Sequence, residues 1–215
     1  MADHDFRSPS IEAFLDDLGS SSPAPGGGAG AALTAAMGAA LVQMLGELTI
    51  GKKKYAAHEE LMQAIVEQAK SERDTLLALA ETDAAAFDGV SAAFKLPKGT
   101  DEEKAARARA IQDAMKKASE VPLEIMHHCL EVISLAKNAV QRGNVNVISD
   151  GAAGAELCRA AMRVAGYNVK INLAAIEDTD YVQHARTRMD EMAYMGTAVA
   201  NEIDSHVNEL WQSGS

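Results

Sequence analysis

The sequence has few aromatic residues, only two cysteines and only five prolines among its 215 residues. Phe, Trp and Tyr make up 4% of the chain, while hydrophobic residues as a whole make up 47%. Alanine, methionine and leucine therefore supply most of the apolar content, and these are good helix formers rather than strand formers. The composition predicts an all-α protein, and the length suits one domain spanning residues 1–215.

The small number of cysteines argues against a disulfide-rich scaffold. Cys129 and Cys158 have no C-x-x-C spacing, and both fall inside helical patterns. We therefore expect two buried, reduced thiols, which suits a cytoplasmic protein. Residues 1–9 are polar and lack the apolar core of a secretory signal, so we expect a flexible N-terminus and no export.

Basic charge is also scarce, with 20 Lys and Arg against 31 Asp and Glu and a formal net charge of -11. Such a chain would repel a phosphate backbone, so we do not expect a nucleic-acid partner. The most apolar stretch, 29–50, is mostly Ala and Gly and includes Gln43 and Glu47. We interpret it as a buried helix and expect no membrane partner.

Motifs for metals and nucleotides are absent or incomplete. His127 and His128 are adjacent, and no H-x-x-x-H or H-E-x-x-H pair occurs, so we expect no metal site. The run 46–53 nearly matches a P-loop, but a lysine stands where Ser or Thr should bind magnesium. The glycines after Pro25 imitate a dinucleotide fingerprint, but two prolines precede them where a strand should be. We expect no cofactor.

The spacing of apolar residues predicts helices joined by short loops. Ser10 can cap a short helix that stops at Gly19 and packs one face. Thr100 opens a helix with a capping box, and Pro122 favours a restart of that helix over a kink. We expect helices at about 11–18, 29–50, 58–94, 100–142 with the break at 122, 151–165 and 179–212, arranged as an antiparallel bundle.

The segment before residue 151 alternates polar and apolar residues but has no second strand to pair with. We therefore expect 143–150 to be a structured loop, with Asp150 capping a helix that ends at Gly166. Residues 167–173 alternate again and give a weaker helical pattern. Asp150 is crowded with Asn144, Asn146 and Ser149, which keeps it a site candidate beside the capping interpretation.

Three further features are candidates for function. The glycine-rich loop before the second helix offers free N–H groups to an anion or a carbonyl-rich ring, although a tight turn for close packing explains it equally well. Lys52, Lys53 and Lys54 form a basic cluster that could hold a carboxylate or complement a helix end. Arg73 and Asp83 fall on the apolar stripe of 58–94, where a charge is costly unless it is paired or functional.

Several of these segments occur in an order that resembles a known family. They are SSPAPGGGAGAAL at 21–33, TIGKKKY at 49–55, the Asp83 to Phe87 segment, Pro122, GNVNVISD at 143–150 and INL at 171–173. This combination resembles the cyclodeaminase/cyclohydrolase family over about 10–212. The resemblance implies a helical bundle that dimerises, with folate sites near the subunit interface. The stretches TIGKKKY, LPKGTDEEKAARA and GNVNVISD are most similar to the stand-alone bacterial cyclohydrolases of the family.

The resemblance implies an activity as well as a fold. Water would add to the carbon that bridges N5 and N10 of 5,10-methenyltetrahydrofolate, giving 10-formyltetrahydrofolate. We expect Asp83 first and Asp150 second as the base, and Lys53 to shuttle a proton or orient the intermediate. The expected substrate-binding residues are Pro25, Gly26, Gly27, Gly28, Lys52, Asn144, Asn146 and Ser149. Two alternatives stay open: a formiminotetrahydrofolate cyclodeaminase that releases ammonia, and a non-enzymatic helical interaction module.

Overall fold

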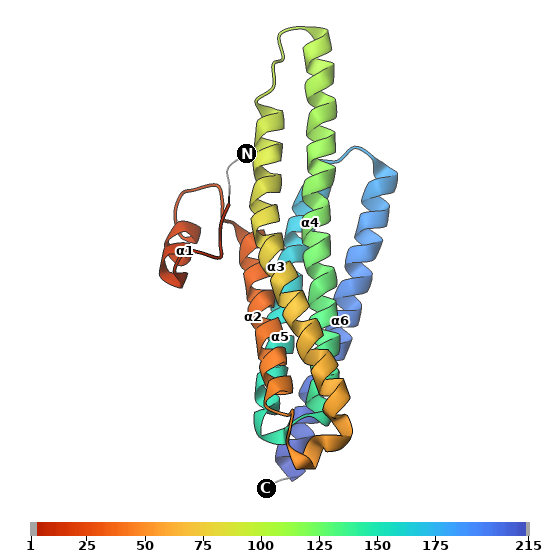
Figure 1. The fold of residues 1–215 in the computed structure, drawn as a ribbon. Coiled ribbons are helices and arrows are strands. Elements are labelled where there is room, and N and C mark those ends of the chain that lie inside the picture. The colour runs from red at the N-terminus through yellow and green to blue at the C-terminus, as the bar shows by residue number, and fades with distance from the viewer. Residues whose placement is uncertain (1–3, 214–215) are drawn as a thin grey trace.

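The computed structural model describes residues 4–213, and this part of the chain contains six α-helices and no strand (Figure 1). The elements are α1 (Ile11–Leu18), α2 (Gly27–Glu47), η1 (Lys53–His58), α3 (Glu59–Phe94), α4 (Asp101–Arg142), η2 (Val145–Val147), α5 (Ile148–Leu173) and α6 (Thr179–Ser213), where η1 and η2 are short 3-10 helices. The prediction of an all-α, single-domain helical bundle is confirmed.

The bundle is built around α2, which packs against α3, α4 and α5. Small residues let these helices approach closely. A side chain at Gly38 would lie 2.6 Å from Cys158 Sγ and 2.7 Å from the carbonyl oxygen of Gly154 on α5. Cys129 and Cys158 are buried free thiols, as predicted. The stretch interpreted as a buried helix is therefore the centre of the core.

By length and composition, α2 is also the one helix within residues 4–213 that could cross a membrane. In the bundle, 56% of its most apolar window is buried. The core helix of a globular protein meets the same criterion, because continuous apolar sequence also serves a helix with neighbours on several sides. The packing of α2 accounts for its composition.

The prediction of a break at Pro122 is wrong, because α4 runs without interruption through this proline. Proline lacks the N–H that would donate to the carbonyl four residues earlier, which belongs to Ala118. In the structure that carbonyl accepts a 2.8 Å hydrogen bond from Asn172 Nδ2 of α5. A side chain from another helix thus replaces the missing donor. The predicted capping box at Thr100 is confirmed.

The start and end predicted for α5 are also wrong. The helix begins at Ile148, directly after η2, with Val147 as its N-cap, so Asp150 lies in the first turn and does not cap the helix. Its end is Leu173, well beyond Gly166. A Cβ at Gly166 would meet Met126 at 3.9 Å, an ordinary van der Waals distance, so this glycine neither ends the helix nor is required by close packing.

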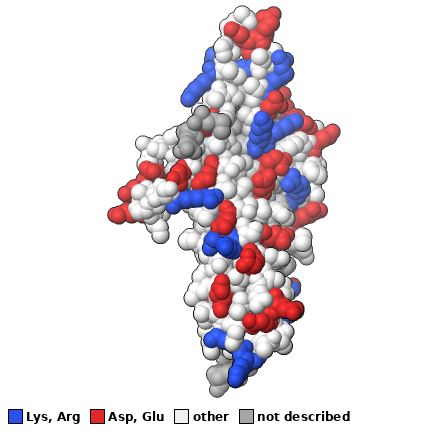
Figure 2. All heavy atoms as spheres, in the orientation of Figure 1, with Lys and Arg blue, Asp and Glu red and all other residues white. Residues whose placement is uncertain are grey.

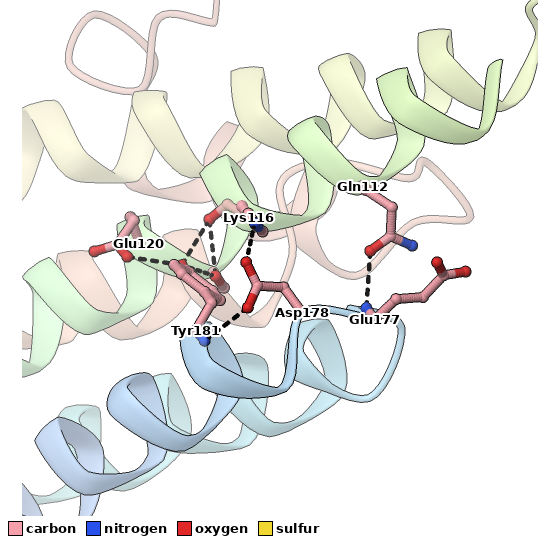
Figure 3. A network of polar contacts seen from close by, with 7 residues as sticks. Gln112, Lys116, Glu120, Glu177, Asp178 and Tyr181 are labelled. Carbon is pink, nitrogen blue, oxygen red and sulfur yellow. Dashed lines mark hydrogen bonds and ion pairs between the residues drawn. The ribbon is translucent and has the colours of Figure 1, made fainter. Parts of the chain in front are cut away.

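A polar network fastens the start of α6 to α4 (Figure 3). The Tyr181 hydroxyl lies 2.7 Å from the Glu120 carboxylate and 2.6 Å from the Ser119 hydroxyl. Asp178 pairs with Lys116 at 2.6 Å and accepts the backbone N–H of Tyr181. Burial raises the pKa of Tyr181 to about 12, so the phenol stays protonated and able to donate. The network fixes the turn between α5 and α6.

The N-terminal part stands apart from the bundle, and α1 has no buried residue (Figure 1). Ser10 caps α1 as predicted, but the expectation that this helix packs one face is wrong: Ile11 is 80% exposed and Leu15 is 56% exposed. Of the stretch expected to be flexible, residues 1–3 lie outside the described part of the chain. Within residues 4–9, His4 forms a 2.9 Å hydrogen bond with Asp88 of α3, and Arg7 forms an ion pair with Glu81 of the same helix.

Charged residues are mixed on the face seen in Figure 2, where acidic and basic side chains alternate along the bundle. Several of them form ion pairs that are mostly exposed, such as Lys104–Asp101 and Lys137–Glu202. Pairs of this kind contribute little to stability, at most about 1 kcal/mol each. The stability of the fold therefore rests mainly on the packing around α2.

Candidate active site

The candidate site is centred on Asp83, which lies on α3 beside the first turn of α2. The backbone N–H of Ala29 faces the Asp83 carboxylate closely enough to lower its pKa. Gly28 provides the room for this contact, because an added Cβ there would lie 2.2 Å from Asp83 Oδ1. A carboxylate at this place interacts favourably with the unpaired N–H groups and the positive end of the α2 dipole. The contact with the start of α2 therefore explains why a charged residue is tolerated on the apolar stripe of α3.

Two influences act on the pKa of Asp83 in opposite directions. Burial of the half-buried side chain raises the pKa above the ordinary value of 3.8, and the smaller effect of the Ala29 N–H lowers it. A carboxylate with a raised pKa is a stronger base than an ordinary aspartate. Asp83 therefore has the chemistry of a general base that is partly shielded from water.

The glycine-rich loop does not present an unoccupied anion site. Gly26 is the N-cap of α2 and has no side chain to cap it, Pro25 is buried, and Gly27 is exposed. The Asp83 carboxylate takes the position that an external anion would occupy at such a helix start. The buried side of the loop is thus occupied by the Asp83 carboxylate of α3. The exposed side at Gly27 remains open to a ligand.

The basic candidates lie at the other end of α2. Lys53 opens η1 and Lys52 is its N-cap, and both side chains are exposed. The 21 residues of α2 separate them from the glycine loop by about 30 Å. Within one chain, the structure therefore does not bring Lys53 together with Asp83.

The remaining polar candidates lie near Lys53, at this second end. Asn144 is buried, and its Nδ2 donates to the Leu48 carbonyl at 3.0 Å while its Oδ1 accepts from the backbone N–H of Asn146. These contacts tie η2 to the end of α2, so the Asn144 side chain has a structural role. Asn146 and Ser149 are exposed and Asp150 is half-buried in the first turn of α5. These four residues lie at the same end of α2 as Lys52 and Lys53, and the six residues are called the lysine-end group below.

One residue near Asp83 was missed in the sequence. Asn168 on α5 places its Nδ2 3.8 Å from where a Cβ of Gly27 would be. Its amide N donates to the Val164 carbonyl of its own helix at 3.1 Å. Asn168 lies in the segment whose alternation obscured the helix. Read as helix, it falls on the same face as the buried Ala161 and Ala165, and a polar side chain on that face would have been a signal.

Within residues 4–213, no group of three His, Cys, Asp or Glu side chains is placed to hold a metal ion. A cavity of about 770 Å³ lies between α1 and the bundle, and Gly27 and Gly30 of the glycine loop form part of its wall. Most of its other walls are apolar, with Leu33 and Met37 of α2 among them. The candidate site therefore borders a large apolar space.

Comparisons with known proteins were made for sequence and for fold. A family profile described as Formiminotransferase-cyclodeaminase matches residues 10–191. Methenyltetrahydrofolate cyclohydrolase from Methylorubrum extorquens is 43% identical over 202 residues, which cover 92% of this chain and 97% of that protein. Formimidoyltransferase-cyclodeaminase from Gallus gallus is 35% identical over 192 residues, which cover 88% of this chain but 36% of that longer protein.

The fold has a counterpart among solved structures. The crystal structure of formiminotetrahydrofolate cyclodeaminase from Thermotoga maritima matches with a TM-score of 0.86 and 28% sequence identity, covering 94% of this chain and 98% of that one. Within residues 4–213 the protein is a bundle of long helices around one buried, glycine- and alanine-rich helix, with the short α1 outside it. The chain belongs to the formiminotransferase-cyclodeaminase family, as the ordered motifs of the sequence predicted.

Proposed function

We propose that this protein is a methenyltetrahydrofolate cyclohydrolase, which interconverts 5,10-methenyltetrahydrofolate plus water and 10-formyltetrahydrofolate. The observation that carries this function is the 43% identity to the Methylorubrum extorquens cyclohydrolase over nearly the full length of both chains. The bifunctional formimidoyltransferase-cyclodeaminases are 31% to 35% identical and extend far beyond the matched region. The function fits a cytoplasmic protein with two reduced thiols.

The hydrolysis requires a base that takes a proton from the attacking water and an acid that donates a proton to the departing nitrogen. In this proposal Asp83 accepts a proton from the water that adds to the carbon between N5 and N10. Its negative charge also stabilises the cationic amidinium of the substrate. Lys53 shuttles a proton or orients the intermediate, and N5 leaves to give the formyl product. Asp150 is the second candidate for the base.

Substrate binding is assigned to two sets of residues, the glycine loop at one end of α2 and the lysine-end group at the other. The loop residues Pro25, Gly26, Gly27 and Gly28 form the wall against which the pterin or benzoyl amide lies. At the lysine end, Lys52 binds a carboxylate of the glutamate tail, while Asn144, Asn146 and Ser149 add polar contacts. Both sets of residues must therefore meet at one substrate, although about 30 Å separates them in a single chain.

A homodimer would unite the two sets. If two chains pair along α2 in opposite directions, a two-fold axis near the middle of this helix brings the lysine end of one chain to the Asp83 end of the other. Each site would then combine Asp83 and the glycine loop of one chain with Lys52 and Lys53 of its partner, and the dimer would hold two such sites. This arrangement makes dimerisation a condition of activity.

The exposed side of α2 supports this dimer. An apolar stripe runs along the helix at three- and four-residue spacing, formed by Leu33, Met37, Leu41, Met44 and Leu48. Met37 is 56% exposed and Met44 is 46% exposed. Such stripes pack against a second helix. The cavity between this stripe and α1 gives the partner room, with Ile11 and Leu15 on its outer wall.

Charge favours the antiparallel pairing. The loop after α2 carries Lys52, Lys53 and Lys54, whereas α1, next to the other end of α2, carries Glu12, Asp16 and Asp17. Antiparallel copies place these opposite charges near each other, and parallel copies would place like charges together. Opposite charges across an interface favour the correct register.

The competing function is that of a formiminotetrahydrofolate cyclodeaminase, the activity for which the Thermotoga maritima protein is named. The test gives purified protein 5,10-methenyltetrahydrofolate and formiminotetrahydrofolate side by side. Accelerated loss of the near-ultraviolet absorbance of the first compound, without ammonia release from the second, supports the cyclohydrolase. Ammonia release would establish the deaminase instead. If neither reaction is accelerated, a non-enzymatic interaction module becomes the better interpretation.

A further inference from the structure

Phe87 is an exposed aromatic side chain on a stripe that should be buried. The sequence has only four phenylalanines, and Phe87 continues the apolar stripe of α3 that includes Leu76 and Ala80. Those two residues are fully buried, yet Phe87 is 46% exposed. Its ring is also not among the side chains packed against the core. The proposed mechanism gives it no part.

The exposure has a structural cause. Helix α2, which covers the stripe of α3 at Leu76 and Ala80, begins at Gly27 level with Asp83, and α3 runs on past this point (Figure 1). Phe87 lies one turn beyond Asp83 on the same face of α3, with the two Cβ atoms about 5–6 Å apart. The Phe87 side chain therefore begins one helical turn from Asp83, just outside the start of α2.

Three side chains from two helices surround this place. Asp83 contacts the first turn of α2, Phe87 lies one turn farther along α3, and Asn168 approaches Gly27 from α5. Asn168 Nδ2 uses one of its protons on Val164, so the second proton and the side-chain oxygen remain for a ligand as far as residues 4–213 show. An acid, an aromatic residue and an amide thus lie close to the first turn of α2.

We infer that the ring of Phe87 is the surface on which the cationic end of the folate substrate stacks. This inference rests on the proposed function. The methenyl bridge makes the fused ring of the substrate a planar cation, and an aromatic face attracts such a cation while also providing a large apolar contact. Asp83 lies one turn away and supplies the negative charge. Hydrolysis removes the positive charge of the bridge, so Phe87 holds the substrate more tightly than the neutral product.

The test compares Phe87→Leu and Phe87→Tyr with Phe94→Leu. Phe94 is a matched control, because it lies seven residues farther on α3, is 48% exposed, and has the Arg107 guanidinium over its ring at 5.6 Å. We expect Phe87→Leu to raise the KM for 5,10-methenyltetrahydrofolate about 3- to 10-fold, the range of a single cation–aromatic contact. The inhibition constant of 10-formyltetrahydrofolate should change less. Phe87→Tyr keeps the ring and should stay within about twofold of the wild type.

Several outcomes would overturn the inference. These are a wild-type KM in Phe87→Leu, an equal rise in Phe94→Leu, or an equal weakening of substrate and product. Melting temperature and dimer content of each variant show whether a change is structural. Calorimetric binding of the methenyl compound to the wild type and Phe87→Leu proteins tests the contact independently of turnover. If the wild-type protein binds but does not hydrolyse the compound, the proposed function fails while the contact can still be judged.

Discussion

Asp83 combines two features at the scale of single residues. It occupies an apolar stripe, where burial raises its pKa, and it faces the start of α2, where the Ala29 N–H lowers it by a smaller amount. The same position explains why residue 28 is glycine, because the carboxylate fills the space of a side chain. The position of the Asp83 carboxylate therefore depends on the glycine at residue 28, and a substitution of Gly28 tests the role of Asp83.

The first prediction concerns pH. As a base, Asp83 works only when it is deprotonated, and its pKa is raised above 3.8. The logarithm of kcat/KM should therefore fall as the pH drops through this raised pKa, giving an acid limb with an apparent pKa above 3.8. Stopped-flow hydrolysis across the acid range measures it, with circular dichroism to show that the fold persists. A limb at or below 3.8 would contradict a shielded Asp83 as the base.

The second prediction uses two neighbouring glycines. Gly28→Ala puts a Cβ 2.2 Å from Asp83 Oδ1 and must displace the carboxylate, while Gly30→Ala meets nothing within 4 Å. A displaced base costs about 100-fold in kcat, so Gly28→Ala should lose activity on this order. Gly30→Ala should fold and dimerise with kcat within about threefold of the wild type. Similar activities of the two variants would show that the position of Asp83 does not matter.

Sequence reasoning worked for some of these residues and failed for others. Asp83 could be singled out because a charged residue at an apolar position of a helical repeat is visible in the sequence itself. Asn168 could not, because the alternation after Gly166 obscured the helix that carries it. The role of Asp150 as a cap failed because η2 leads directly into α5 and moves the helix start three residues earlier.

At the scale of helices, close approach between α2 and α5 organises the bundle. Gly38 and Gly154 face each other, and a side chain on either would lie 2.7 Å from the carbonyl oxygen of the other. Backbone atoms cannot move aside as a flexible side chain does. The long alanine- and glycine-rich sequence of α2 is therefore a requirement of packing, and its resemblance to a membrane span is a by-product.

The third prediction tests this crossing. Gly38→Ala should lower the free energy of unfolding by about 1–3 kcal/mol, because the added methyl overpacks the contact with Cys158 and Gly154. Gly89→Ala is the control, since nothing lies within 4 Å of its Cβ position on α3. That change should be neutral or stabilising by up to about 1 kcal/mol. Urea denaturation measures both, and equal stabilities would contradict the close crossing.

The helix limits show what local pattern can and cannot predict. Caps at Ser10 and Thr100 were predicted because their partners lie within three residues in the sequence. The continuity of α4 through Pro122 was not, because its compensating donor is Asn172, on another helix. Contacts between distant segments override local signals, and one sequence does not display them.

At the scale of the whole molecule, the proposed site is divided between the two ends of α2. The sequence does not display this separation, because it shows the chemistry of Asp83 and Lys53 but not their places along the bundle. Once α2 is a helix of 21 residues, Asp83 and Lys53 are about 30 Å apart. The exposed apolar stripe on the same helix supplies a physical reason for a second chain.

The fourth prediction follows from this division. Asp83→Asn and Lys53→Met should each be nearly inactive alone. When the two variants are unfolded together and refolded as a mixture, half of the dimers pair one of each and contain one intact site. The mixture should then regain about one quarter of the wild-type activity, as random pairing in a two-fold dimer requires. If mixed dimers form, as co-purification of an affinity-tagged variant with the untagged one shows, and no activity returns, both residues lie in one chain or outside the site.

The most direct measurement is the rate at which 5,10-methenyltetrahydrofolate loses its near-ultraviolet absorbance, compared for wild-type protein, Asp83→Asn and buffer alone. Asparagine has nearly the same size and keeps an oxygen that can face the Ala29 N–H, so the variant should keep its fold and remove only the base. We predict that the wild type exceeds the spontaneous rate and that Asp83→Asn lowers kcat by about 100-fold or more. A wild-type rate equal to that in buffer, or a folded variant as fast as the wild type, would contradict this account.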